Sequence, residues 1–399
     1  MTNRFRLPKI RKAAALLWLL FSPVLVAAQT SIQTAAEQYE KWLPMVQGKK
    51  LGLVVNHTAV VGKQHLLDLL LDQKQTVLAV YAPEHGFRGE AEAGAGIKDG
   101  KDSKTGIPIV SLYGKKKKPL PADLKGVELL IFDMQDVGAR FYTYISTLHY
   151  VMEACAELSI PLLVLDRPNP NGHYIDGPIL DTAFRSFVGM HPVPVVHGMT
   201  IGEYACMING EGWLAGGLSC SLEVFKVAGY DHQKVYQLPI PPSPNLPDMR
   251  SVYLYPSTCF FEGVKVSLGR GTDKPFQLAG TPWFRGGDTS FVPRSIPGKA
   301  ANPPFLNETC YGYSFVNRSL QDLQAQKQID LQPLIDFYRQ APDKKDFFLP
   351  FFEKLAGGAE LRKQIEAGAT AEAIRGSWKP GLKAFAVTRA KYLLYPHTP

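Results

Sequence analysis

Four short apolar runs, separated by segments of helical periodicity, constrain the fold of this chain more than any other feature. The runs are residues 51–57, 76–85, 127–136 and 160–170. Continuous runs of Val, Leu and Ile are typical of strands that are buried on both faces. The segments at 62–73 and 147–159 carry apolar residues at helical spacing. Strands alternating with helices predict an α/β fold, a doubly wound parallel sheet.

Polar side chains stand where each of these runs ends. They are Asn56 and His57 after the first run, Glu84 and His85 after the second, Asp133, Asp136 and Arg140 after the third, and Asp166 and Arg167 after the fourth. The carboxyl ends of parallel strands meet at one edge of the sheet, where ligands bind. The alternative is that each residue caps a turn or a helix. Capping alone does not call for His and Arg beside the acids, so the pattern favours a cleft.

Glu84 is the sharpest candidate for acid–base chemistry. It lies in the stretch "VYAPEHGFRG", where a strand is followed directly by a carboxylate, a histidine and an arginine. Apolar surroundings at a cleft favour the protonated carboxyl that a general acid requires. The alternative is a structural glutamate that pairs with Arg88 or His85.

Two further segments combine charged and aromatic side chains in a way that suits a sugar, whose faces are apolar and whose rim is polar. Residues 132–150 contain Asp133, Gln135, Asp136, Arg140, Tyr142 and Tyr144. In residues 165–178, Arg167 and Asn169 are placed to bind an anion or hydroxyls. The alternatives are a helix N-terminus for the first segment and an ordered turn for the second.

The character of the chain changes near residue 240. Residues 237–249 are rich in proline and predict a crossover between a domain at 29–245 and a smaller C-terminal α+β domain at 246–399. In the second half we expect a strand over 264–268 and helices over 329–340 and 370–385. Gly376 and Pro380 should break or kink the last helix. Glu262 and Arg270 form a charged segment that resembles a site wall, although a structural turn fits equally well.

The first 28 residues have the pattern of a secretory signal peptide: a basic start, an apolar run and small residues before a cut after Ala28. We therefore expect a periplasmic or secreted protein without a membrane span after cleavage. The formal net charge of +8 falls to +3 once the five cations of this segment are removed, which does not favour nucleic acid as a partner. The sequence gives no indication of oligomeric state.

Several common sites are not predicted. Five widely spaced cysteines match neither a disulfide scaffold nor a zinc pattern. The glycine-rich nucleotide motifs and the G-x-S-x-G elbow do not occur at the required places. We therefore expect no cofactor and no metal.

Taken together, these segments resemble a bacterial family of secreted exo-β-N-acetylmuramidases, the NamZ type. The matching stretches include "GLVVNHTAV", "APEHGFRG", "FDMQDVGARFYTYISTLHYVMEA", "LDRPNPNGHYIDGP" and "FFEGVKVSLGRGTDKPF". The resemblance implies a Rossmann-like domain without a nucleotide, a smaller C-terminal domain, and a cleft that releases terminal N-acetylmuramic acid from the non-reducing end of peptidoglycan-derived glycans. It also places the family's proposed catalytic glutamate on Glu84.

The resulting hypothesis is glycoside hydrolysis with Glu84 as general acid. The second catalytic group is Glu262 or Asp136, unless the 2-acetamido group of the substrate itself attacks. Arg140 or Arg167 would pair with the lactyl carboxylate of muramic acid, and His85 would orient Glu84. The substrate-binding candidates are Asn56, His85, Arg88, Asp133, Arg140, Tyr142, Tyr144, Asp166, Arg167, Asn169 and Arg270. The rival hypothesis is a periplasmic binding protein for sugars or muropeptides, without catalysis.

Overall fold

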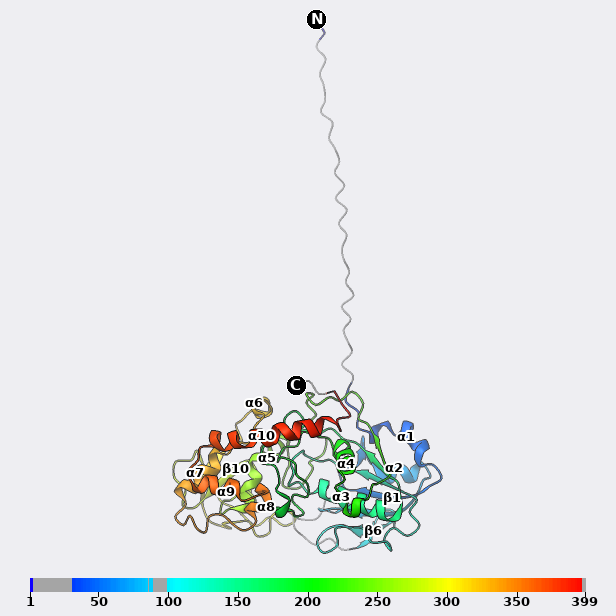
Figure 1. The fold of residues 1–399 in the computed structure, drawn as a ribbon, viewed down its shortest axis with the longest axis horizontal. Coiled ribbons are helices and arrows are strands. Elements are labelled where there is room, and N and C mark those ends of the chain that lie inside the picture. The colour runs from blue at the N-terminus through cyan, green and yellow to red at the C-terminus, as the bar shows by residue number, and fades with distance from the viewer. Residues whose placement is uncertain (3–30, 85, 89–98, 397–399) are drawn as a thin grey trace. The chain divides into compact units, whose positions relative to one another are not determined.

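A seven-stranded sheet lies at the centre of the N-terminal half of the chain (Figure 1). The computed structural model describes residues 1–2, 31–84, 86–88 and 99–396. The strands are β1 (Lys50–Val55), β4 (Thr76–Ala82), β5 (Gly100–Lys101), β6 (Pro108–Ser111), β7 (Leu129–Asp133), β8 (Leu162–Leu165) and β9 (Leu222–Phe225). Their order is β5-β6-β4-β1-β7-β8-β9, and each neighbouring pair is parallel except β5 with β6.

Helices cover both faces of this sheet, as a doubly wound fold requires. They are α1 (Tyr39–Val46), α2 (Leu66–Asp72), α3 (Tyr144–Leu158) and α4 (Ile201–Gly210). Along β7, Leu129 and Ile131 belong to the same apolar core as α1 and α2, whereas Leu130 and Phe132 belong to the core of α3 and α4. Alternate residues of a strand point to opposite faces, so the two cores are the two sides of the sheet. The predicted α/β class is confirmed.

The four strands expected from the sequence are β1, β4, β7 and β8, while β6 and β9 were not predicted. Both of these are four residues long and only partly buried. A short, half-exposed strand at the side of a sheet carries little hydrophobic signal, which explains the omission. The remaining short pieces are the β2 (Val60–Val61) and β3 (Gln64–His65) hairpin and the 3-10 turns η1 (Ala36–Gln38), η2 (Thr182–Phe184), η3 (Ala215–Gly217) and η4 (Cys259–Gly263).

The C-terminal half is a smaller α+β arrangement. It contains α5 (Met249–Thr258), α6 (Leu320–Gln326), α7 (Gln332–Gln340), α8 (Phe352–Ala356), α9 (Glu360–Glu366) and α10 (Ala371–Ala390), with an antiparallel sheet of β10 (Leu278–Thr281), β12 (Cys310–Ser314) and β11 (Thr289–Phe291) in that order. Its apolar side chains continue the core that packs under α3 and α4. The boundary at residue 245 stays a prediction.

Two local expectations in this half need correction: the strand at 264–268 was wrong, and the last helix is not broken at Pro380. Residues 264–268 form only isolated bridges to Phe348 and Gly280 instead of a strand. Residues 371–390 form one helix that runs past Pro380. Thr370 caps this helix by accepting the amide of Ala373, and Trp378 and Phe385 are buried on either side of the proline. Tertiary packing therefore outweighs the local cost of Pro380.

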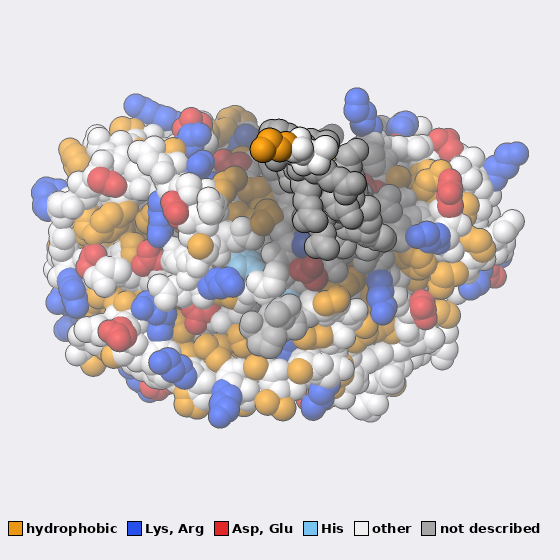
Figure 2. All heavy atoms as spheres, turned by 90° about the horizontal axis from the view of Figure 1, so that it is seen from above, with side chains coloured by type: hydrophobic (Ala, Val, Ile, Leu, Met, Phe, Trp, Pro, Cys, Tyr) orange, Lys and Arg blue, Asp and Glu red, His pale blue; other side chains and the backbone are white. Residues whose placement is uncertain are grey.

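None of the described helices combines the length and the hydropathy needed to cross a membrane. Figure 2 shows one face of the molecule, on which positive and negative side chains are interspersed. This face therefore shows no surface of a single sign of charge.

Candidate active site

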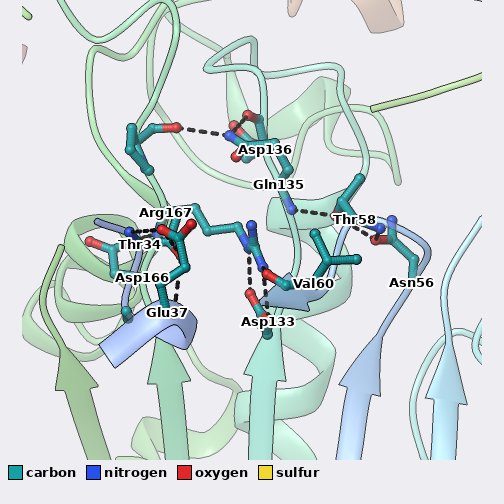
Figure 3. A network of polar contacts seen from close by, with 12 residues as sticks. Thr34, Glu37, Asn56, Thr58, Val60, Asp133, Gln135, Asp136, Asp166 and Arg167 are labelled. Carbon is teal, nitrogen blue, oxygen red and sulfur yellow. Dashed lines mark hydrogen bonds and ion pairs between the residues drawn. The ribbon is translucent and has the colours of Figure 1, made fainter. Parts of the chain in front are cut away.

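The polar residues that follow the strands meet at one edge of the sheet, as predicted, but most of them bond to each other. Figure 3 shows Asp133 at the end of β7 with the guanidinium of Arg167 above it. Arg167 donates from Nε to Oδ1 of Asp133 at 2.5 Å and from Nη2 to Oδ2 at 2.9 Å. Both residues are buried. This ion pair ties the ends of β7 and β8 together and leaves Arg167 without access to a ligand.

Asp166 is a second buried acid at this edge. Its side chain accepts from the amide of Gly202 at 2.8 Å and from the hydroxyl of Thr200 at 2.7 Å. Burial raises the pKa of Asp166 to about 6, although these hydrogen bonds favour the charged form. Thr200 is also the N-cap of α4. Asp166 therefore binds the N-terminus of α4. For this residue the structural alternative, helix capping, fits the structure and a ligand-binding role does not.

Asp136 and Asn169 shape the loop that follows β7. Oδ2 of Asp136 accepts the amide of Gly138 at 2.6 Å. Gly138 has φ +75°, and a Cβ there would lie 2.2 Å from Oδ1 of Asn169, so only glycine fits this turn. Burial raises the pKa of Asp136 to about 7. Neither Asp136 nor Asn169 lines the pocket described below.

Arg140 does not reach a ligand either. Its guanidinium donates to four backbone carbonyls at 2.7–2.9 Å, those of Pro178, Val193, Leu355 and Ala356. The side chain is completely buried, and burial lowers its pKa to about 10. Two of these carbonyls come from α8 in the C-terminal half. Arg140 is a cross-link between the two halves, which a lactyl carboxylate cannot contact.

Arg88 also lies outside the pocket lining. It forms a bidentate pair with Asp102 at 2.9 Å for each of two nitrogen–oxygen contacts. His85 lies outside the described residues, so its predicted role beside Glu84 stays a prediction.

A cavity of about 410 Å³ is lined by predicted site residues that are not described above. This volume is in the range of small-molecule sites. Five predicted site residues line it: Glu84, Glu262, Arg270, Tyr142 and Tyr144. Glu84 follows the end of β4, Tyr144 begins α3 and Tyr142 lies just before it, and Glu262 and Arg270 come from the C-terminal half. The pocket therefore lies between the two halves of the chain.

Glu84 reaches this pocket because the chain turns directly after β4. The amide of Gly86 bonds to the carbonyl of Pro83 at 3.0 Å, and Gly86 has φ +77°. Two hydroxyls then hold the carboxyl group. Tyr113 donates to Oε1 at 2.9 Å, and Thr143 donates to Oε2 at 2.9 Å. Burial, together with the neighbouring Glu84, raises the pKa of Tyr113, so its hydroxyl stays a donor at neutral pH.

Glu262 is the second carboxylate of the pocket. It lies in η4 and accepts from Nε of Arg270 at 3.0 Å, with a further contact from Nη2 to the same oxygen. Burial opposes the charge of Arg270, but the Glu262 carboxylate outweighs burial and raises the pKa of Arg270. The guanidinium also lies over the ring of Phe276, 5.0 Å from its centre. Glu262 and Arg270 thus form a salt bridge in the wall of the pocket, and Phe276 supports its arginine.

Aromatic rings form another part of the wall. Tyr142 and Tyr144 meet edge to face with ring centres 4.8 Å apart. The hydroxyl of Tyr142 donates to the carbonyl of Pro242 at 2.7 Å, and that of Tyr144 accepts from Asn56 at 2.7 Å. Asn56 therefore supports the pocket from behind and does not line it. The rings offer apolar faces of the kind that pack on a sugar.

Sequence reasoning missed several lining residues, including Tyr113, Thr143, Asn245 and Lys299. Tyr113 follows β6, so prediction of that strand would have brought it to the same sheet edge as Glu84. Thr143 stands between the two predicted tyrosines. No local pattern identifies Asn245 or Lys299, which reach the pocket from the proline-rich crossover and from a loop of the C-terminal half. Within the described part of the chain, no group of three or more His, Cys, Asp or Glu side chains is arranged to hold a metal ion.

Comparison with known proteins agrees with this arrangement. Residues 51–250 match the family "Exo-beta-N-acetylmuramidase NamZ, N-terminal", and residues 253–395 match the corresponding C-terminal family. The chain is 40% identical, over 92% of its length and 91% of the relative, to the peptidoglycan beta-N-acetylmuramidase NamZ of Bacillus subtilis (strain 168). Two crystal structures of DUF1343 family proteins from Bacteroides fragilis NCTC 9343 superpose on it with TM-scores of 0.86 and 0.77, at 48% and 30% identity. Each covers 92% of this chain, with 100% and 99% of the solved chain included.

A pocket with two carboxylates between a Rossmann-like sheet and a smaller domain is compatible with glycoside hydrolysis, and the family match assigns the chain to this class of enzyme, the glycoside hydrolases. The chain belongs to the NamZ family of exo-β-N-acetylmuramidases. The predicted resemblance is confirmed, and membership of an enzyme family favours a hydrolase over a binding protein without catalysis.

Proposed function

We propose that this protein releases terminal N-acetylmuramic acid from the non-reducing end of peptidoglycan fragments, with Glu84 as the general acid. The observation that carries the proposal is the placement of Glu84 in a monosaccharide-sized pocket with a second carboxylate, Glu262, and aromatic walls. The name of the Bacillus subtilis relative supports the substrate class.

In this proposal Glu84 gives its proton to the glycosidic oxygen as the bond from the sugar to that oxygen breaks. Water supplies the hydroxyl of the released sugar, so the overall step is hydrolysis. Tyr113 and Thr143 hold the carboxyl in one orientation, and their hydroxyls can accept as well as donate when Glu84 changes its protonation state. Glu262 acts as the second carboxylate. Asp136, the other candidate, is buried away from the lining.

Glu84→Gln tests the acid role. A general acid contributes about 10²- to 10⁴-fold, and it matters most for a poor leaving group. We expect a loss of this size on a muramic acid–glucosamine disaccharide and a much smaller loss on a nitrophenyl muramic acid glycoside. Glu372→Gln, at an exposed glutamate of α10, is the matched control. Equal losses on the two substrates would remove Glu84 from the acid role, and full activity on both would refute the site.

Glu262→Gln tests the second carboxylate. Because this residue would act on the sugar side of the bond, we expect the loss to be similar for the disaccharide and the nitrophenyl glycoside. Unchanged kcat on both substrates would leave the acetamido group of the substrate as the attacking group.

We further propose that the protein works outside the cytoplasm, in the periplasm or after secretion. The support is the signal-peptide pattern of residues 1–28. The mass of the protein from a periplasmic fraction should correspond to a chain that begins at Gln29. An intact N-terminus in a cytoplasmic fraction would exclude this localisation.

A further inference from the structure

The charges of the pocket lining are not equally available to a ligand. Among its described residues, two side chains are cationic, Arg270 and Lys299. Arg270 contacts Glu262 through two nitrogens, so its charge is matched inside the wall. Lys299 is exposed and makes no ion pair or side-chain hydrogen bond with the described part of the chain. It is the cation of this pocket that can meet an anionic ligand.

Hydrogen bonds fix the backbone of Lys299, whereas its side chain is exposed. The amides of Lys299 and Ala300 both bond to the carbonyl of Ile296, at 3.1 and 2.8 Å, which closes a tight turn. Nδ2 of Asn245 donates to the carbonyl of Lys299 at 3.1 Å. Asn245 is itself buried and lines the pocket. The turn therefore fixes the backbone from which the long, exposed side chain of Lys299 extends at the pocket.

Three of the arginines that the sequence suggested for substrate binding are engaged elsewhere. Arg167 is paired with Asp133, and the guanidinium of Arg140 is bonded to four carbonyls. Arg88 is paired with Asp102. None of the three lines the pocket. An anion that binds to any of these three arginines would have to displace an internal contact. Binding to Lys299 displaces no contact within the described part of the chain.

We infer that Lys299 binds the lactyl carboxylate of the terminal N-acetylmuramic acid and is a specificity-determining residue. This inference rests on the proposed function. N-acetylmuramic acid differs from N-acetylglucosamine by a lactyl ether that ends in a carboxylate at neutral pH. An ammonium at the pocket rim distinguishes the two sugars by charge.

The test compares two nitrophenyl glycosides of N-acetylmuramic acid, one with the free lactyl carboxylate and one with its methyl ester. The pair has nearly the same size and the same leaving group, and it differs in charge. We expect Lys299→Gln to lower kcat/KM for the free acid by about 10- to 100-fold, mainly through KM, and to leave the ester unchanged. Lys299→Arg should retain most of the activity on the acid. Lys383→Gln, at an exposed lysine of α10, should change neither rate.

A binding measurement separates this inference from the proposed function. By calorimetry, Lys299→Gln should weaken binding of free N-acetylmuramic acid at least tenfold and leave N-acetylglucosamine unchanged. The inference is overturned if Lys299→Gln lowers kcat/KM equally for the free acid and the methyl ester. It is also overturned if the variant binds N-acetylmuramic acid as tightly as the wild type does. Binding that behaves as expected in a protein that cleaves neither glycoside would support Lys299 and refute hydrolysis.

Discussion

The hydroxyl of Tyr113 lies 2.9 Å from Oε1 of Glu84, and this contact joins the residues that follow the neighbouring strands β6 and β4. A second hydroxyl contact to the carboxyl comes from Thr143. A carboxyl that must face the glycosidic oxygen depends on such neighbours, because a glutamate side chain has several rotatable bonds.

Tyr113→Phe should therefore reduce turnover without removing the ring. We expect kcat on the disaccharide to fall about 2- to 10-fold, the range for the net contribution of one hydrogen bond between neutral groups, while KM changes little. Tyr311→Phe, at an exposed tyrosine, is the control and should behave as the wild type. In a double mutant with Glu84→Gln, Tyr113→Phe should cause no further loss, because the two residues act as a unit. Additive losses would contradict the positioning role.

Arg140→Met should destabilise the protein strongly. The change removes the donors of four buried carbonyls, and we expect the free energy of unfolding to fall by roughly 3–5 kcal/mol. Urea denaturation measures this change. Arg389→Met is the matched comparison, because Arg389 is also buried but donates to one carbonyl, that of Gly198. Its loss should be clearly smaller, and equal losses for the two variants would mean that the four contacts of Arg140 carry no special weight.

Stability should fall as pH rises from about 4 to 7, partly because of Asp136. Burial raises the pKa of Asp136 from 3.8 to about 7. The folded state therefore holds a proton that the unfolded state releases, and the contribution present below pH 4 is lost as pH passes through 7. Its full size is about 4 kcal/mol. Asp136→Asn should flatten this part of the profile, measured by urea denaturation at several pH values, with exposed Asp343→Asn as the control. A profile as steep as that of the wild type would show that Asp136 does not titrate in this way.

The sheet could be predicted from the sequence because its central strands are buried on both faces. The apolar runs of the sequence correspond to β1, β4, β7 and β8. Because these strands are parallel, their carboxyl ends lie at one edge of the sheet, independent of the conformation of the loops. The strands β6 and β9 could not be predicted in this way, because each is short and half-exposed. Glu84, Tyr142 and Tyr144 were among the predicted residues that line the pocket. Asp133, Asp166 and Arg167 were equally plausible in the sequence, and they pair internally.

The sequence by itself determined the class of fold, the family and the edge of the sheet at which polar residues collect, because the periodicity and local motifs that carry this information are properties of the chain. Only the tertiary structure decided which of those residues face a ligand. A carboxylate and a guanidinium at the same sheet edge can bind each other or a substrate, and the choice depends on contacts between distant segments. Arg140 and Arg167 bind within the protein, while Lys299, which no local pattern marks, is brought to the rim of the pocket by a turn that Asn245 holds from more than 50 residues away.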